Sequence, residues 1–198
     1  MALQHAVSEG SKRYTRTVMA IHWLSAFVVM AAFVTGLEGP ARVIFSDAHL
    51  SDRQWHETLG VTIVALTLLR VVWRLLAGAR APKLPMPRWM HIASKALQGF
   101  LYLLLLAVPI TGLITVGTGG HGIELLGGAH IMPPAPLNEA LSHQLGDIHK
   151  LMGDAIMWLA GVHAVAALFH HYVLRDGVLN SMLPAGLAAR LPGPKPVA

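Results

Sequence analysis

Four long apolar stretches are the feature that most restricts the fold of this chain. They lie at about residues 18–37, 55–76, 96–117 and 148–174. Each is long enough to cross a bilayer, because a membrane-spanning helix needs roughly 20 apolar residues. Helices suit this setting because they satisfy their own backbone hydrogen bonds where no water can do so. We therefore predict an all-α integral membrane four-helix bundle, formed as one domain over residues 1–198.

The composition supports a membrane protein and limits its chemistry. Of 198 residues, 54% are hydrophobic and 13% are charged, whereas about 25% are charged in an ordinary soluble domain. The chain has no cysteine, which excludes disulfides, iron–sulfur clusters held by thiolates and haem attached through thioether bonds. Its 12 histidines outnumber its 10 carboxylates. Any bound metal is therefore expected to depend on imidazole ligands.

The basic residues predict an orientation in the membrane. Twelve lie on one side of the four stretches, namely Lys12, Arg13, Arg16, Arg70, Arg74, Arg80, Lys83, Arg88, Lys95, Arg175, Arg190 and Lys195. Three lie on the other side, namely Arg42, Arg53 and Lys150. By the positive-inside rule, both termini should be cytoplasmic in a bacterial inner membrane. This placement accounts for the net charge of +5 without a nucleic-acid partner. The loops at about 38–54 and 118–147 would face outward, the second with a short surface helix near 137–145.

Four histidines fall at two depths of the predicted bundle. We call His56 and His149 the outer pair, and His22 and His163 the inner pair. His149 and His163 stand fourteen residues apart, which is nearly four helical turns, so they share one helix face about 21 Å apart along the axis. Ionisable side chains inside a membrane are expensive without a partner and mark functional sites.

Two imidazoles on opposite sides of one iron form a six-coordinate b-type haem site, and facing helices of a bundle are where such cofactors bind. The residue four positions after each candidate ligand is small, and these residues are Ala26, Gly60, Gly153 and Ala167. That spacing leaves room for a macrocycle one turn away on the ligand face. Taken singly, any of the four histidines could instead be a core residue bonded to a carbonyl. Zinc is less favoured, because pairs about 21 Å apart cannot share one ion and zinc takes three or four protein ligands.

Several other basic side chains need separate interpretations. Arg70 follows His56 by fourteen residues, so it should face the bundle at the inner level and pair with a charge such as a haem propionate. Arg74 is equally well explained as an arginine that snorkels to the interface. His170 follows His163 by two turns and should face the core, whereas His171 should point elsewhere. The remaining histidines are expected at the surface, and they are His5, His49, His91, His121, His130 and His143.

Three motifs of the chain resemble the bacterial cytochrome b561 family, which is related to the cytochrome b subunits of nickel–iron hydrogenases. They are "RYTRTVMAIHW", the histidine and glycine that open the second stretch with "LLRVVWRL" after them, and "GVHAVAALFHHYVLRD". The resemblance extends over essentially all of residues 12 to 183. It implies two b-type haems, each with bis-histidine ligation, and transfers the ligand role to His22, His56, His149 and His163.

The resemblance also implies a function. Members couple to the quinone pool, and some resemble superoxide oxidases, so the chain is expected to be an oxidoreductase of the superoxide:ubiquinone type. Electrons would pass from a periplasmic one-electron donor, such as superoxide, through two haems to ubiquinone, with His170 and Arg70 acting at the quinone. The alternative is a haem b subunit that docks to a dehydrogenase or hydrogenase and has no substrate of its own. A transporter or assembly factor is least favoured, because no pair of broken helices marks a midplane site.

Overall fold

The computed structural model describes residues 13–36, 46–76 and 86–191. Its elements in chain order are α1 (Arg16–Val34), the 3₁₀ turn η1 (Asp47–His49), α3 (Leu50–Leu76), α4 (Arg88–Thr118), β1 (Ile123–Glu124), β2 (His130–Ile131), α5 (Glu139–Phe169), the π-helical turn η2 (His170–Leu174), α6 (Val178–Ser181) and α7 (Ala185–Ala188). Four helical segments within these residues are long and apolar enough to cross a membrane. The prediction of an all-α membrane four-helix bundle is confirmed.

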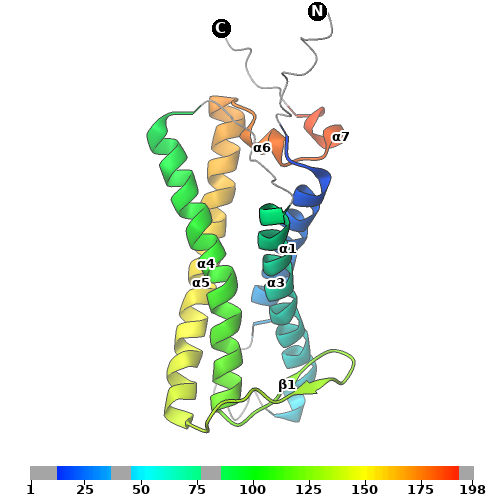
Figure 1. The fold of residues 1–198 in the computed structure, drawn as a ribbon, viewed down its shortest axis with the longest axis vertical. Coiled ribbons are helices and arrows are strands. Elements are labelled where there is room, and N and C mark those ends of the chain that lie inside the picture. The colour runs from blue at the N-terminus through cyan, green and yellow to red at the C-terminus, as the bar shows by residue number, and fades with distance from the viewer. Residues whose placement is uncertain (1–12, 37–45, 77–85, 192–198) are drawn as a thin grey trace, which may run out of the picture.

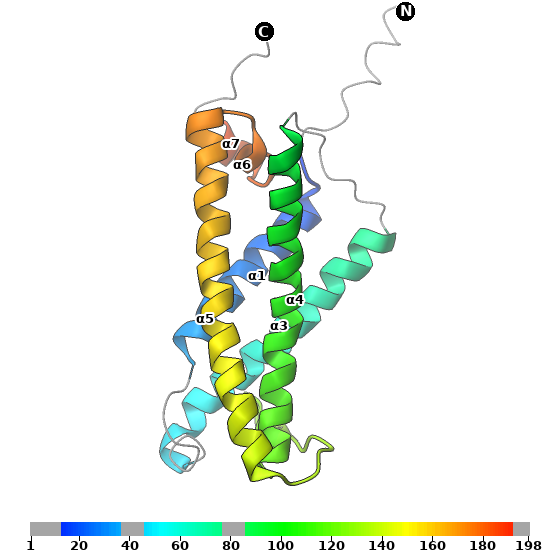
Figure 2. The same cartoon turned by 90° about the vertical axis from the view of Figure 1, so that its left-hand side faces the viewer.

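The four long helices form two pairs. Helix α4 packs closely along α5, and α1 packs along α3 (Figure 1). The pairs are inclined to each other, so that α1 and α3 run obliquely past the upright α4 and α5 (Figure 2). Helix α3 also touches α4, whereas α1 and α5 make little contact. The small buried core between α1 and α3 consists of Val28, Ala32 and Ile63. The two pairs thus meet mainly through α3 and α4.

The helices begin earlier than hydropathy predicts. Helix α3 starts at Leu50 and α4 at Arg88, several residues before the apolar stretches at 55 and 96. The surface helix expected near 137–145 is not a separate element, because α5 begins at Glu139 and continues through it. Asn138 caps this start by accepting a hydrogen bond from the Leu141 N–H at 3.0 Å, as N-cap residues do. Hydropathy marks only the part of a helix that meets lipid, so polar first turns escape it.

Some sequence predictions fall outside the described residues. These positions are His5, Lys12, Leu37, Arg42, Arg80, Lys83 and Lys195. Five of them belong to the charge count behind the predicted orientation, which therefore remains a prediction.

A short segment folds back over one end of the bundle. We call residues 176–183 the C-terminal cap. The indole N–H of Trp23 donates to the Met182 carbonyl at 2.9 Å, and the Tyr14 N–H donates to the Ser181 carbonyl at 3.0 Å. The Arg13 guanidinium donates to the Leu183 carbonyl. These bonds attach the cap to the start of α1, and both lie at the same end of the molecule (Figure 1).

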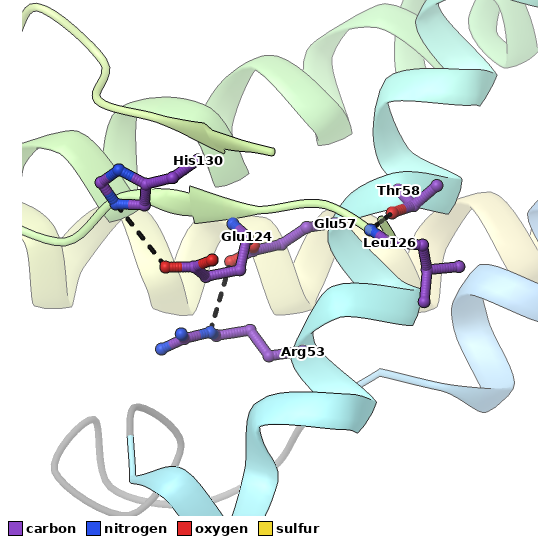
Figure 3. Close-up of polar contacts among 6 residues, drawn as sticks. All are labelled: Arg53, Glu57, Thr58, Glu124, Leu126 and His130. Carbon is purple, nitrogen blue, oxygen red and sulfur yellow. Dashed lines mark hydrogen bonds and ion pairs between the residues drawn. The ribbon is translucent and has the colours of Figure 1, made fainter. Parts of the chain in front are cut away.

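A small hairpin covers the opposite end, and the sequence reading did not predict it. Strands β1 and β2 pair antiparallel, with Glu124 opposite His130. The turn between them uses Gly127 and Gly128 at φ 92° and 82°, a left-handed conformation that glycine adopts without steric penalty. The hairpin lies against the first turns of α3 (Figure 3).

Candidate functional site

The outer pair joins two helices across the gap in the bundle. The ring centroids of His56 on α3 and His149 on α5 lie 6.0 Å apart, with the ring planes at 78°. Nδ1 of His56 lies 3.0 Å from the Ala32 carbonyl, and Nδ1 of His149 lies 2.9 Å from the Val108 carbonyl. A carbonyl oxygen only accepts, so each Nδ1 carries the proton and each Nε2 keeps its lone pair. In metal-binding histidines, a hydrogen bond from the ring nitrogen that does not bind the metal fixes the tautomer.

Glycines set the space around the outer pair. A Cβ atom at Gly112 of α4 would lie 3.0 Å from Cε1 and 3.1 Å from Nδ1 of His149, so the imidazole rests directly on the α4 backbone. A Cβ at Gly60 or Gly153 would have no neighbouring atom within 4 Å. The position one turn after each outer histidine therefore opens onto free space, as a flat ligand held by these residues requires.

The inner pair repeats the arrangement further along α5. His22 on α1 and His163 on α5 have ring centroids 6.3 Å apart, with the planes at 70°. The edge of Trp23 lies against His22, at a centroid distance of 5.4 Å. Among the described residues, neither imidazole of the inner pair has a hydrogen-bond partner. The structure thus brings together the four histidines that the sequence singled out, in the two pairs that their depth predicted.

The donor set fits a metal that brings its own macrocycle. With metal–nitrogen bonds of about 2.0–2.1 Å, imidazoles on opposite sides of one metal have centroids roughly 6 Å apart. Both pairs match this spacing. Within residues 13–36, 46–76 and 86–191, no group of three or more His, Asp or Glu side chains is placed to hold a metal ion. Two imidazoles and no further protein ligand are what a b-type haem takes.

Arg70 lies near the inner pair, as the fourteen-residue spacing predicted. It is an electrostatic neighbour of both His22 and His163. Its guanidinium carbon lies 5.0 Å from the ring centroid of Tyr102, within the range of a cation–π contact. Tyr14 lies beyond the start of α1, and its burial raises the pKa of the phenol, while the positive charges of Arg74 and Arg70 lower it. The net shift is upward, so the phenol stays neutral and can donate a hydrogen bond at physiological pH.

The two histidines after α5 depart from the expected pattern. His170 is partly buried and pairs through Nδ1 with the Asp176 carboxylate. His171, which we expected to point elsewhere, is the more buried of the two, with 2% of its surface exposed. The reason is the π-helical turn at His170–Leu174, whose wider i→i+5 spacing breaks the 3.6-residue register. Extrapolating the α-helical face beyond Phe169 was therefore wrong for His171.

The other histidines in the described residues lie at or near the surface. His49, His130 and His143 form ion-pair contacts with Asp52, Glu124 and Glu139, and His91 is exposed. His121 is only partly exposed, and its pKa is lowered by burial and then by the positive charge of Arg53. None of these residues joins the two central pairs.

Comparison with known proteins identifies the family. The family model for prokaryotic cytochrome b561 matches residues 13–185. The chain belongs to the prokaryotic cytochrome b561 family. This membership confirms the resemblance seen in the motifs. It makes the protein a bacterial membrane cytochrome that carries haem b and transfers electrons.

Several curated relatives match along nearly their whole length. Cytochrome b561 homolog 2 of Escherichia coli strain K12 is 28% identical over 174 residues, covering 87% of this chain and 92% of the relative. The probable superoxide oxidase CybB of Yersinia pestis is 31% identical over 179 residues, covering 87% and 97%. Cytochrome b562 of Cereibacter sphaeroides is 31% identical over 174 residues, covering 86% and 94%. The relatives thus carry more than one name within a single family.

Proposed function

We propose that this cytochrome takes single electrons from a periplasmic donor, with superoxide as the leading candidate, and passes them through two b-type haems to ubiquinone. The observation that carries this proposal is that two histidine pairs lie at two levels of one bundle. His149 and His163 are fourteen residues apart on α5, about 21 Å along its axis, so the two sites are stacked from one side of the membrane toward the other. Haem iron alternates between ferric and ferrous states, so each haem would accept and release one electron at a time.

In this proposal His56 and His149 hold the outer haem, and His22 and His163 hold the inner one. Support for the outer site comes from the two Nδ1–H donors to carbonyls, which leave both Nε2 atoms free. Support for the inner site comes from the matching centroid distance. The positive charge of Arg70 beside the inner pair would balance the negative propionates that such a haem carries.

The quinone would be reduced at the inner end. Reduction of one ubiquinone consumes two electrons and two protons. The His170–Asp176 pair could relay protons there, since an imidazole can accept a proton at one ring nitrogen and release one from the other. Arg70 could also stabilise the negative charge that develops on a quinone oxygen before a proton arrives. We assign the catalytic roles to His170 and Arg70 on this basis.

Superoxide is favoured as the donor by one relative, since the Yersinia pestis protein is described as a probable superoxide oxidase. Among the described residues, the outer end adds the turn η1, a small hairpin and the first turns of α3 and α5 to the bundle. These short additions suit a small diffusible donor better than a large docked partner protein.

The deciding experiment uses the purified protein in liposomes that contain ubiquinone. Superoxide is generated outside, and haem reduction and ubiquinol formation are followed by absorbance. Reduction of both haems followed by stoichiometric ubiquinol is expected, and added superoxide dismutase should abolish it. If superoxide fails while a membrane extract with its dehydrogenases reduces the haems, the protein is instead a haem b subunit of a partner enzyme.

A further inference from the structure

At the end of the bundle that we propose faces the cytoplasm, two buried polar atoms have no hydrogen-bond partner among the described residues. They are Nε2 of His171 on η2 and Oδ1 of Asn180 on α6, two short elements that contact each other. His171 is buried, and its ring centroid lies 4.7 Å from that of Tyr172. The turn η2 that carries it packs against α6 of the C-terminal cap. The role proposed above for His170 makes no use of either atom.

The backbone around these atoms is held in an unusual conformation. The π-helical turn is followed by Arg175, which has a left-handed φ of 52°. For a residue other than glycine this conformation is uncommon and is retained when the surroundings enforce it. Asp176 follows at once, where its Oδ1 accepts from the Val178 N–H at 3.0 Å and its Oδ2 pairs with His170. Trp23 and Tyr14 then clamp the cap to α1.

The two unpaired atoms require a small polar ligand. A buried polar group without a hydrogen bond destabilises a fold by about 1–3 kcal/mol, and native proteins keep few such groups. A side chain with 2% of its surface exposed leaves no room for a quinone ring. Water is the ligand that buried unsatisfied polar atoms commonly bind, and the two atoms lie on η2 and α6, which contact each other.

We propose that His171 and Asn180 hold buried water that carries protons from the His170–Asp176 pair to the quinone. This inference rests on the proposed function, because it names the proton source for the same reaction. One ubiquinone takes two electrons through the haems and two protons from cytoplasmic water, and becomes ubiquinol. The His171 ring can accept a proton at Nε2 and release one from Nδ1. The titratable groups near it in the chain are His170, Tyr172 and Asp176, and the Arg13 guanidinium donates to the Leu183 carbonyl of the cap.

The test compares two electron acceptors in three variants. The variants are His171→Phe, which keeps the ring shape, His171→Gln, which keeps a hydrogen-bonding group, and Asn180→Leu. Haems are reduced beforehand, and their reoxidation is followed by stopped flow with ubiquinone, which takes up protons, and with ferricyanide, which does not. The exposed His143→Phe at the other end of the bundle is the matched control.

We expect His171→Phe and Asn180→Leu to slow reoxidation by ubiquinone at least about tenfold, with a larger solvent deuterium isotope effect and an unchanged ferricyanide rate. His171→Gln should recover part of the rate. An equal loss with both acceptors, or no loss with ubiquinone, overturns the proposal. Thermal unfolding is an independent arm. If the site holds no water, His171→Phe removes an unpaired polar group and raises the unfolding temperature. That result would overturn the proposal whether or not ubiquinone reoxidises the wild-type protein.

Discussion

Gly112 and His149 lie in contact, although they come from different helices and 37 positions separate them in the chain. A methyl group at Gly112 would lie 3.0 Å from Cε1 of His149. Helix α4 contributes none of the proposed ligands, yet it sets the position of one through this contact and through the Val108 carbonyl at 2.9 Å.

Gly112→Ala should therefore impair the outer haem selectively. The new methyl group would clash with the His149 ring. The ring would be displaced from the Val108 carbonyl that its Nδ1–H donates to. We expect the variant to retain the inner haem and to lose half of the haem per chain, or to show a shifted reduction potential for one haem. Gly99→Ala on the same helix is the control, because a Cβ there has no neighbouring atom within 4 Å. Equal haem spectra in both variants would contradict the contact's role.

Replacing the proposed ligands should divide the haems into two classes. His56→Ala or His149→Ala should remove mainly the outer haem, and His22→Ala or His163→Ala mainly the inner one. The pyridine haemochrome assay gives the stoichiometry, and His91→Ala serves as an exposed control. Two haems per chain in all four variants would show that the ligand assignment is wrong.

His170→Ala should keep both haems and slow their reoxidation by ubiquinone. The reason is the loss of the pair with Asp176, through which protons would enter. Stopped-flow reoxidation at saturating quinone measures the effect. An unchanged rate would move the acceptor site away from this end of the bundle.

Glu57→Gln should loosen the hairpin at the outer end. The Glu57 carboxylate accepts from the Glu124 N–H and lies 3.9 Å from Nε of Arg53, and Thr58 beside it accepts from the Leu126 N–H at 2.9 Å (Figure 3). An amide oxygen accepts a weaker hydrogen bond than a carboxylate and forms no ion pair with Arg53, so hydrogen exchange at residues 123–131 should become faster. The control variant is Glu139→Gln, which changes an exposed carboxylate in contact with His143. Equal exchange in the two variants would mean that other contacts hold the hairpin.

The predicted orientation can be tested with reporter fusions. A reporter after Ala198 should be active only in the cytoplasm, and one inserted in the loop at 118–147 only outside. The twelve-to-three asymmetry of basic residues motivates this expectation. The reverse pattern would exchange the donor and acceptor sides of the proposed function.

Local periodicity predicted the parts of the site that lie within regular helices. The levels of His22, His56, His149 and His163, and the placement of Arg70, follow from hydropathy and the 3.6-residue repeat. Those rules concern residues close together in the chain. The fit of Gly112 against His149, and the docking of the hairpin on Glu57, depend on contacts between distant segments, which no local pattern reveals.

His171 shows a different limit of sequence reasoning. Its position depends on a change from α-helical to π-helical spacing at His170. Neither residue type nor hydropathy in "HHYVL" signals that change. A sequence reading that carries the α-helical register one turn too far therefore assigns His171 to the wrong environment.

The sparse contact between α1 and α5 has a consequence for the life of the protein in the cell. Each proposed haem would bridge the two helix pairs, since His22 and His56 lie on one pair and His149 and His163 on the other. Newly inserted chains would then be joined mainly through α3 and α4, with α1 and α5 apart, until haem arrives. In haem-starved bacteria such chains should be recognised by membrane proteases, so the supply of haem would set the abundance of the protein after translation.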